Sequence, residues 1–156
     1  FRSGLGALSY NLDGYHMTKV GHQRPDPQIE LGQQLRQLGI HSMNDISDGL
    51  GSELNEIASA SNVSIVIEEK AIPLHEETYE LAKYLQTNPV DYALYGGEDF
   101  QLVFTAPKSL LSKLENLAGI TIIGEVVSGP AQVQMVTPDK TIKTIEAKGY
   151  NHFHES

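Results

Sequence analysis

Two aspartates flank a serine in the stretch 44–52, which reads Asn-Asp-Ile-Ser-Asp-Gly-Leu-Gly-Ser. Asp45 and Asp48 are three residues apart, so both carboxylates can face one divalent ion. Carboxylate oxygens are ligands that Mg²⁺ prefers, and waters and substrate phosphates usually complete its coordination shell. Ser47 offers a hydroxyl to a phosphate oxygen between the two acids. The residue types and their spacing therefore indicate a site for Mg²⁺ and phosphate.

The same stretch leads into an amphipathic helix. Its apolar side carries Leu50, Leu54, Ile57, Ala58 and Ser61, and its polar side carries Ser52, Glu53, Asn55 and Glu56. This spacing predicts a helix that begins near Asp48, with Asp48 as its N-cap. The free N–H groups and the positive end of the helix dipole favour a carboxylate there, and they can also receive a phosphate oxygen.

A second interpretation of Asp45, Ser47 and Asp48 needs no ligand. In it, the three side chains satisfy free amide groups of a capping turn and do nothing more. Caps are far commoner than metal sites, so the spacing alone leaves both interpretations open.

A Gly-Gly pair followed by two acids forms a second informative stretch. Gly96, Gly97, Glu98 and Asp99 precede an expected strand in which Phe100, Leu102 and Phe104 alternate with other residues. Glycines allow a backbone to approach a ligand closely. The pair is equally typical of a tight turn whose two acids are solvated.

Alternating helices and strands are expected to position these stretches. Apolar periodicity and Pro or Gly boundaries predict helices at 4–12, 27–38, 75–86 and 108–117, strands at 62–68 and 120–127, and a hairpin of 133–136 with 141–145. The helix at 27–38 is expected to bury Ile29, Leu31, Leu35 and Leu38 and to end at Gly39; the helix at 75–86, to bury Tyr79, Leu81, Ala82 and Leu85. This order predicts a mixed α/β domain, an α+β mixed sheet with helices packed on one main face.

Composition narrows the classes of function. The chain has 156 residues, of which 40% are hydrophobic and 20% charged, as in one ordinary globular domain. Its net charge of −9 argues against non-specific binding to nucleic acid or to an anionic membrane. The absence of cysteine excludes disulfides and thiol chemistry, and no apolar stretch approaches membrane-spanning length. A cytoplasmic location is the default expectation.

Three motifs in this order resemble the bacterial thiamine-monophosphate kinase family. They are Met43–Leu50, Gly96–Phe100 and the closing Gly149–Phe153, with Arg24–Pro27 ahead of them. The match covers nearly the whole chain as the family's C-terminal domain. The family belongs to the PurM-like ATP-binding superfamily, whose members pair an N-terminal domain with a C-terminal α/β domain and usually dimerise through the N-terminal halves. The resemblance implies that 1–20 is the remnant of a junction with a missing N-terminal domain, that 21–156 is a PurM C-terminal-like domain, and that the full-length protein is a homodimer.

The reaction implied by the resemblance is transfer of the γ-phosphate of ATP to thiamine monophosphate, giving thiamine diphosphate and ADP, with Mg²⁺ and without a phosphoenzyme. Carried over by position, Asp45 and Asp48 resemble Mg²⁺ ligands and Ser47 a contact of the ATP phosphates. Glu98 and Tyr150 resemble substrate contacts. A carboxylate and an aromatic face both suit the cationic thiazolium ring of that substrate.

Some residues depart from the family pattern. Asn44 stands where an apolar residue is common, Phe100 where tyrosine is usual and Asn151 where aspartate is frequent. The family's ATP site also takes acidic residues from the N-terminal domain, so we expect this chain alone to fold but not to catalyse. Two other functions remain open: another ATP-dependent enzyme of the superfamily, and a non-catalytic ligand-binding fragment.

Overall fold

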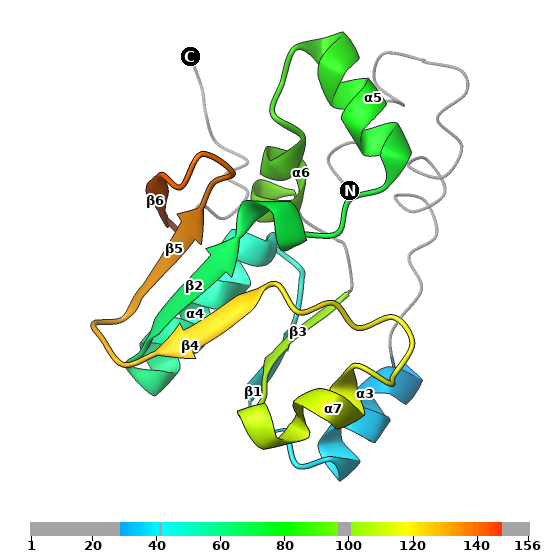
Figure 1. Cartoon of the computed structure of the whole chain (residues 1–156), viewed down its shortest axis with the longest axis vertical. Helices are drawn as coiled ribbons and strands as arrows, with labels where there is room; N and C mark the ends of the chain where they lie inside the picture. Colours follow the sequence, from blue (N-terminus) through cyan, green and yellow to red (C-terminus); the bar gives the residue numbers. More distant parts are fainter. Residues whose placement is uncertain (1–28, 41, 97–100, 148–156) are drawn as a thin grey trace.

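A mixed four-stranded sheet lies at the centre of the computed structural model, which describes residues 29–40, 42–96 and 101–147 (Figure 1). Its strand order is β4 (Gly124–Val127), β2 (Ser64–Glu68), β5 (Gln132–Val136) and β6 (Ile142–Ile145). Strand β2 pairs antiparallel with β4 and parallel with β5, and β5 pairs antiparallel with β6. The predicted mixed sheet and the predicted hairpin are both confirmed.

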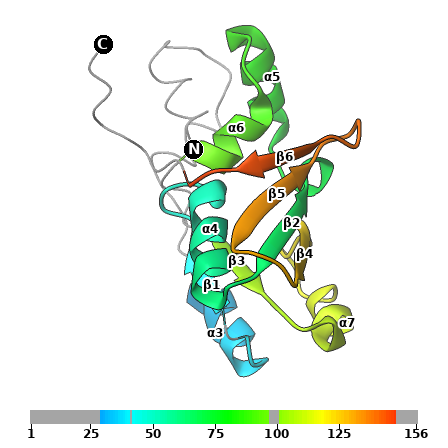
Figure 2. The ribbon, with the colours of Figure 1, turned by 90° about the vertical axis from the view of Figure 1, so that its left-hand side faces the viewer.

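Helix α4 (Leu50–Ser61) covers one face of this sheet, as the side view in Figure 2 shows. The residues that form the core between them are buried: Leu54, Ile57 and Ala58 from the helix and Ile65, Ile67, Val133, Met135 and Ile145 from the strands. The apolar face predicted for this helix is confirmed at four positions, but Ser61 is exposed. Ser61 is the last residue of the helix, where the chain turns at Asn62 into β2.

A separate two-stranded ribbon carries the first motif. Strand β1 (Ser42–Asp45) pairs antiparallel with β3 (Leu102–Thr105), and Asp45 lies opposite Leu102. Strand β3 was predicted from the alternation of Phe100, Leu102 and Phe104, but β1 was not, because its four residues include only one apolar side chain, Met43.

Helix α3 (Ile29–Gln37) lies against this ribbon. A Cβ placed on Gly32 would lie 3.5 Å from the Leu102 side chain, so the helix approaches the ribbon closely. The predicted core face is wrong in part: Leu35 is fully buried, but Leu31 and Leu38 are half-buried and Ile29 is 66% exposed. A ribbon of two strands offers a narrower apolar surface than a four-stranded sheet, so it covers less of the helix. Gly39, with φ +85°, ends the helical turn as predicted.

Two further helices, α5 (Glu76–Leu85) and α6 (Pro89–Tyr95), follow β2. In α5, Leu81 and Ala82 are buried as predicted, whereas Leu85 is half-buried and Tyr79 is exposed. Tyr79 is excluded from the core because Thr78 takes the buried position beside it.

Helix α6 was not predicted, although the sequence carries its start signal. The Asn88 side chain accepts a hydrogen bond from the backbone N–H of Val90 at 3.2 Å, and Pro89 occupies the first turn.

The bounds of some elements differ from the predictions. The helix predicted at 108–117 is a 3₁₀ turn, η2 (Lys108–Leu110), followed by the short α7 (Leu111–Leu114). Strand β4 begins only at Gly124, where a Cβ would lie 2.1 Å from the Val66 carbonyl oxygen. Another 3₁₀ turn, η1 (Glu69–Ala71), follows β2. The helix predicted at 4–12 lies outside the described residues.

A network of side chains fixes the turn of the β5–β6 hairpin. The Thr137 hydroxyl donates to the Asp139 carboxylate, which also accepts the backbone N–H of Thr141 at 3.2 Å and its hydroxyl at 3.1 Å. These bonds, chiefly the one from Thr137, lower the pKa of Asp139 below its ordinary value.

Among the helices of the described ranges, none is long and apolar enough to cross a membrane.

The sheet core should be sensitive to truncation at Ile67, which is 1% exposed on β2. We expect Ile67→Ala to lower the free energy of unfolding by about 2–5 kcal/mol, because it removes buried methyl groups and leaves a cavity. The control is Ile142→Ala on β6 of the same sheet, where the side chain is 61% exposed and the loss should stay below about 1 kcal/mol. Urea denaturation measures both, and equal losses would contradict the assigned core.

Candidate functional site

The turn between β1 and α4 presents the two predicted metal ligands on the surface. Ile46 is buried in the core, and its backbone N–H donates to the Gln101 carbonyl at 2.8 Å. On either side of it Asp45 and Asp48 are exposed. The Ser47 hydroxyl donates to the Asp45 carboxylate at 2.6 Å. The structure therefore brings the predicted residues of the first motif together on one short turn.

The N-cap predicted at Asp48 is wrong. Helix α4 begins at Leu50, its N-cap is Gly49, and no side chain caps that position. Gly49 adopts φ 99° and ψ 150°, a conformation that side-chain-bearing residues rarely adopt. This places Asp48 one residue too early to be the cap. The Asp48 carboxylate is therefore not used as the cap that the ligand-free interpretation requires.

Glu53 was predicted to lie on the polar face of α4, and this prediction is also wrong. Its side chain is only 7% exposed, and it accepts hydrogen bonds from the Asn44 side-chain amide at 3.1 Å and the Asp48 backbone N–H at 3.4 Å. The sequence carries no local signal for an inward-pointing Glu53, because a capping box would need Ser or Thr three residues before the glutamate, where Leu50 stands.

The exposed carboxylates fit a partial Mg²⁺ site. Within residues 29–40, 42–96 and 101–147, no group of three or more His, Cys, Asp or Glu side chains is placed to hold a metal. Mg²⁺ in phosphate-handling sites is usually bound through one or two protein carboxylates, with waters and substrate phosphates as the other ligands. Asp45 and Asp48 supply donor atoms of the right kind, and further ligands would have to come from bound phosphates or from elsewhere.

The N-terminus of α4 packs unusually closely against the C-terminus of α6. A Cβ on Gly49 would lie 2.6 Å from the Leu94 carbonyl oxygen, and one on Gly51 would lie 3.0 Å from the same atom. Figure 1 shows α6 above the start of α4. Glycine at both positions allows backbone to lie against backbone. Because α6 ends at Gly96, this packing brings the start of the second motif to the first.

The other end of the second motif is held beside the first motif as well. Residue Gln101 accepts the Ile46 N–H, and Leu102 pairs with Asp45 across the β1–β3 ribbon. The two residues that bound 97–100 therefore both lie next to the β1–α4 turn. Glu98 itself lies outside the described residues, so its role stays a prediction.

Strand β6 ends at the same helix. The Asn55 side-chain amide donates to the Gly51 carbonyl at 2.8 Å and to the Ile145 carbonyl at 2.9 Å. These two bonds tie the last residue of β6 to the first turns of α4. The chain that leads to the third motif thus leaves the sheet beside the first motif. Tyr150 lies outside the described residues, and its role also stays a prediction.

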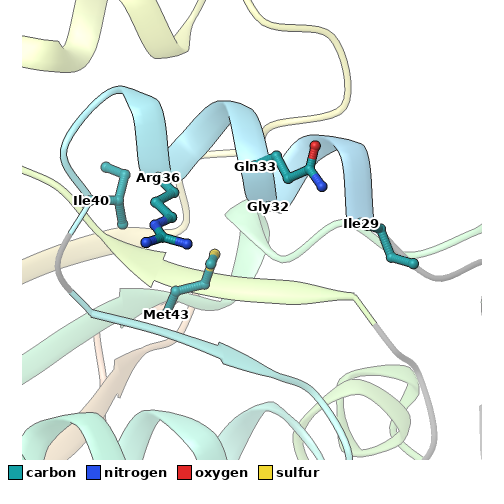
Figure 3. Close-up of a pocket in the computed structure, with 6 residues that line it drawn as sticks. All are labelled: Ile29, Gly32, Gln33, Arg36, Ile40 and Met43. Atoms are coloured by element: carbon teal, nitrogen blue, oxygen red, sulfur yellow. The ribbon is translucent and has the colours of Figure 1, made fainter.

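A surface hollow lies between α3 and β1, and Met43 at the start of the first motif helps to line it (Figure 3). It is lined by Ile29, Gly32, Gln33, Arg36, Ile40 and Met43. Of the predicted site residues that the structure describes, Asp45, Ser47 and Asp48, none lines this hollow.

Comparison with known proteins places this arrangement in a family. Residues 3–136 match the model of the AIR synthase related protein family, C-terminal domain. The chain belongs to this family. As a C-terminal domain of the AIR synthase related family, it has the fold class predicted from the sequence.

The relatives of this AIR synthase related domain include thiamine-monophosphate kinases. One from Bacillus subtilis (strain 168) is 39% identical over 137 residues, which cover 85% of this chain and 41% of the relative. One from Aquifex aeolicus (strain VF5) is 35% identical over 156 residues, which cover 97% of this chain and 48% of the relative. The resemblance inferred from the motifs is confirmed. The chain spans less than half the length of these two relatives.

Solved structures show the same similarity. The structure of AaThiL complexed with AMPPCP and TMP superposes with a TM-score of 0.78 at 33% identity, covering 97% of this chain and 47% of that one. A hydrogenase maturation protein, HypE, in complex with ATP matches with a TM-score of 0.58 at 26% identity, covering 69% of this chain and 35% of that one. The arrangement of helices and strands is therefore shared with AaThiL, solved with AMPPCP and TMP, and with HypE, solved with ATP.

The close packing of α4 on α6 should make Gly49 intolerant of a side chain. We expect Gly49→Ala to lower the free energy of unfolding by more than about 2 kcal/mol, because backbone strain of about 1–3 kcal/mol adds to overlap with the Leu94 carbonyl. Gly39→Ala is the matched control, since Gly39 also has a positive φ but a Cβ there would have no neighbour within 4 Å. Urea denaturation compares the two, and equal losses would show that the contact with α6 is not a constraint.

Proposed function

We propose that this chain is the C-terminal domain of a thiamine-monophosphate kinase, which transfers the γ-phosphate of ATP to thiamine monophosphate and yields thiamine diphosphate and ADP. The observation that carries the proposal is the meeting of three segments at the start of α4: the Asp45–Asp48 turn, the residues on both sides of the second motif, and the end of β6. The names of the relatives, and the ligands named for AaThiL, agree with it.

In the proposed mechanism, Asp45 and Asp48 hold Mg²⁺, and Ser47 contacts the phosphates of ATP. Bound Mg²⁺ offsets the negative charge of the phosphates and of the developing transition state. A chain with a net charge of −9 has little else with which to attract a polyphosphate. Phosphoryl transfer is catalysed mainly by positioning the reactants and neutralising their charge. A turn that presents two exposed carboxylates to a metal ion can contribute to both.

Glu98 and Tyr150 are proposed to bind thiamine monophosphate. A carboxylate attracts the thiazolium cation, and an aromatic ring can stack on it. Support comes from their neighbours in the chain: Gly96 and Gln101 bracket the segment of Glu98, and β6 leads toward Tyr150 from a point beside Gly51.

The remaining parts of the proposal concern the complete protein. We propose that residues 1–20 belong to a junction with a preceding domain and that 21–156 form the PurM C-terminal-like domain. The preceding domain would supply further acidic ligands for ATP and Mg²⁺ and the contacts of a cytoplasmic homodimer. The chain covers 41% and 48% of two kinase relatives, and this partial coverage supports a further domain in the complete protein.

Turnover of the full-length protein tests the proposed function. With ATP, Mg²⁺ and thiamine monophosphate, we expect thiamine diphosphate and ADP in equal amounts. Asp45→Asn and Asp48→Asn should each lower turnover at limiting Mg²⁺ by about 100-fold, because each removes a metal ligand. Loss of a residue that only supports a metal ligand typically costs about 10–100-fold in metal affinity or activity. Their unfolding transitions should stay close to that of the unaltered protein, since both side chains are exposed.

Two controls accompany this assay. Asp91→Asn alters a different exposed aspartate, which lies in the first turn of α6, and it should leave turnover unchanged. The chain 1–156 alone should give no turnover, because transfer needs both substrates held in line. Full activity of both aspartate variants at limiting Mg²⁺ would contradict the proposal that Asp45 and Asp48 bind the metal. Turnover by the chain alone would show that no other domain is needed.

The substrate roles have their own test. Glu98→Gln and Tyr150→Ala should each raise the KM for thiamine monophosphate by about tenfold, as expected from loss of an interaction with a cation worth about 0.5–2 kcal/mol. The KM for ATP should remain nearly the same. Steady-state kinetics with each substrate varied in turn gives both values. A higher KM for ATP alone would show that the two roles are misassigned.

A further inference from the structure

The buried carboxylate of Glu53 accepts hydrogen bonds from both ends of the turn that carries the proposed metal ligands. The Glu53 side chain accepts from the Asn44 amide at 3.1 Å, before the turn, and from the Asp48 backbone N–H at 3.4 Å, within it. Asp45 and Ser47 lie between these two attachment points. The segment 44–48 is thereby closed into a loop whose ends are held by a single side chain.

We propose that Glu53 is a positioning residue for the Mg²⁺ and ATP side of the site: it holds Asp45, Ser47 and Asp48 in the arrangement that binds a metal–nucleotide complex. This inference rests on the proposed function for its ligand, but the clamp itself is a property of residues 44–53. Glu53 touches neither substrate nor metal in the proposed site, and it acts through the turn.

Burial makes Glu53 suited to this role. A carboxylate is costly to remove from water unless hydrogen-bond donors replace the water, and Glu53 has two donors although it is only 7% exposed. Its position on α4 is fixed by the helix, which packs through Leu54 and Ile57 into the core. These two hydrogen bonds therefore tie an exposed turn to a helix that packs into the buried core.

The local backbone explains why such a clamp is needed. Gly49 caps α4 without a side-chain hydrogen bond, so no side chain of the cap residue holds the turn that precedes the helix. The hydrogen bond from Asp48 to Glu53 supplies that restraint one residue earlier. Ligands that must meet one metal ion gain affinity when groups behind them fix their orientation.

Chemistry separates Glu53 from its neighbour Glu56. Both carboxylates accept from the Asn44 amide, Glu56 at 3.2 Å, but Glu56 is exposed, and the Asp48 N–H donates to Glu53. In Glu53→Gln the side chain keeps its size but has only one acceptor oxygen, so it can retain one of the two bonds. In Glu56→Gln the clamp from Glu53 to Asp48 remains intact.

The test measures binding of Mg²⁺ with AMPPCP to the full-length protein by calorimetry. We expect Glu53→Gln to weaken this binding about tenfold, as loss of a supporting partner typically does, whereas the KM for thiamine monophosphate stays unchanged. Glu56→Gln should match the unaltered protein in both. A purely structural role would lower the melting temperature of Glu53→Gln without this selective loss. Unchanged Mg²⁺–AMPPCP affinity in folded Glu53→Gln, or an equal loss in Glu56→Gln, would overturn the proposal.

Amide hydrogen exchange provides a second measurement that needs neither activity nor a folded variant. In the unaltered protein, the Asp48 N–H should exchange more slowly than an unbonded amide, because it is bonded to Glu53. Exchange at the rate of an unprotected amide would overturn the clamp. If the unaltered protein bound no Mg²⁺–AMPPCP while Asp48 was protected, the proposed function would fail together with this ligand role, but the clamp would stand.

Discussion

The contact between the first turn of α4 and the last turn of α6 is the constraint on which the site depends. It brings two backbones together at Gly49 and Gly51, where any side chain would meet the Leu94 carbonyl. Because α6 is anchored there and β3 is paired with β1, both ends of the second motif are fixed relative to the first. The glycines that look like loop formers in the sequence are therefore packing residues. They set how close two functional segments can lie.

Polar side chains of α4 complete this arrangement on two sides. Glu53 reaches back to the turn before the helix, and Asn55 reaches the end of β6. The two residues are two positions apart in the sequence but bond to different segments. A single helix thus holds the proposed metal turn on one side and the strand that leads to the third motif on the other, while its apolar face packs on the sheet.

Much of the fold could be predicted because its signals are local. The periodicity of α4, the alternation in β2 and the turn of the β5–β6 hairpin each lie within one short stretch. Helix α6 was missed because seven residues show too little periodicity, although Asn88 and Pro89 mark its start.

The site could be predicted only in part. The types and spacing of Asp45, Ser47 and Asp48 pointed to the exposed turn that the structure contains. The burial of Glu53 could not be seen, because it depends on Asn44 in a strand that packs against α4 only in the folded protein. The N-cap was predicted at the wrong residue for a similar reason. The start of α4 at Gly49 is set by the backbone contact with α6, which is distant in sequence, and not by the local preference of an aspartate for helix ends.

The parallel pairing of β2 with β5 has a consequence for how the protein is made. Ser64 lies opposite Gln132, so the two central strands of the sheet are joined by most of the second half of the chain. During synthesis β2 emerges from the ribosome long before its parallel partner, with α4 already able to form beside it. Until β5 arrives, the edge of β2 that pairs with it has no strand partner. Contacts this distant in sequence slow folding, because a long loop must close before they form. The β5–β6 hairpin, in contrast, is local and can form as soon as it is synthesised, so its arrival completes the sheet.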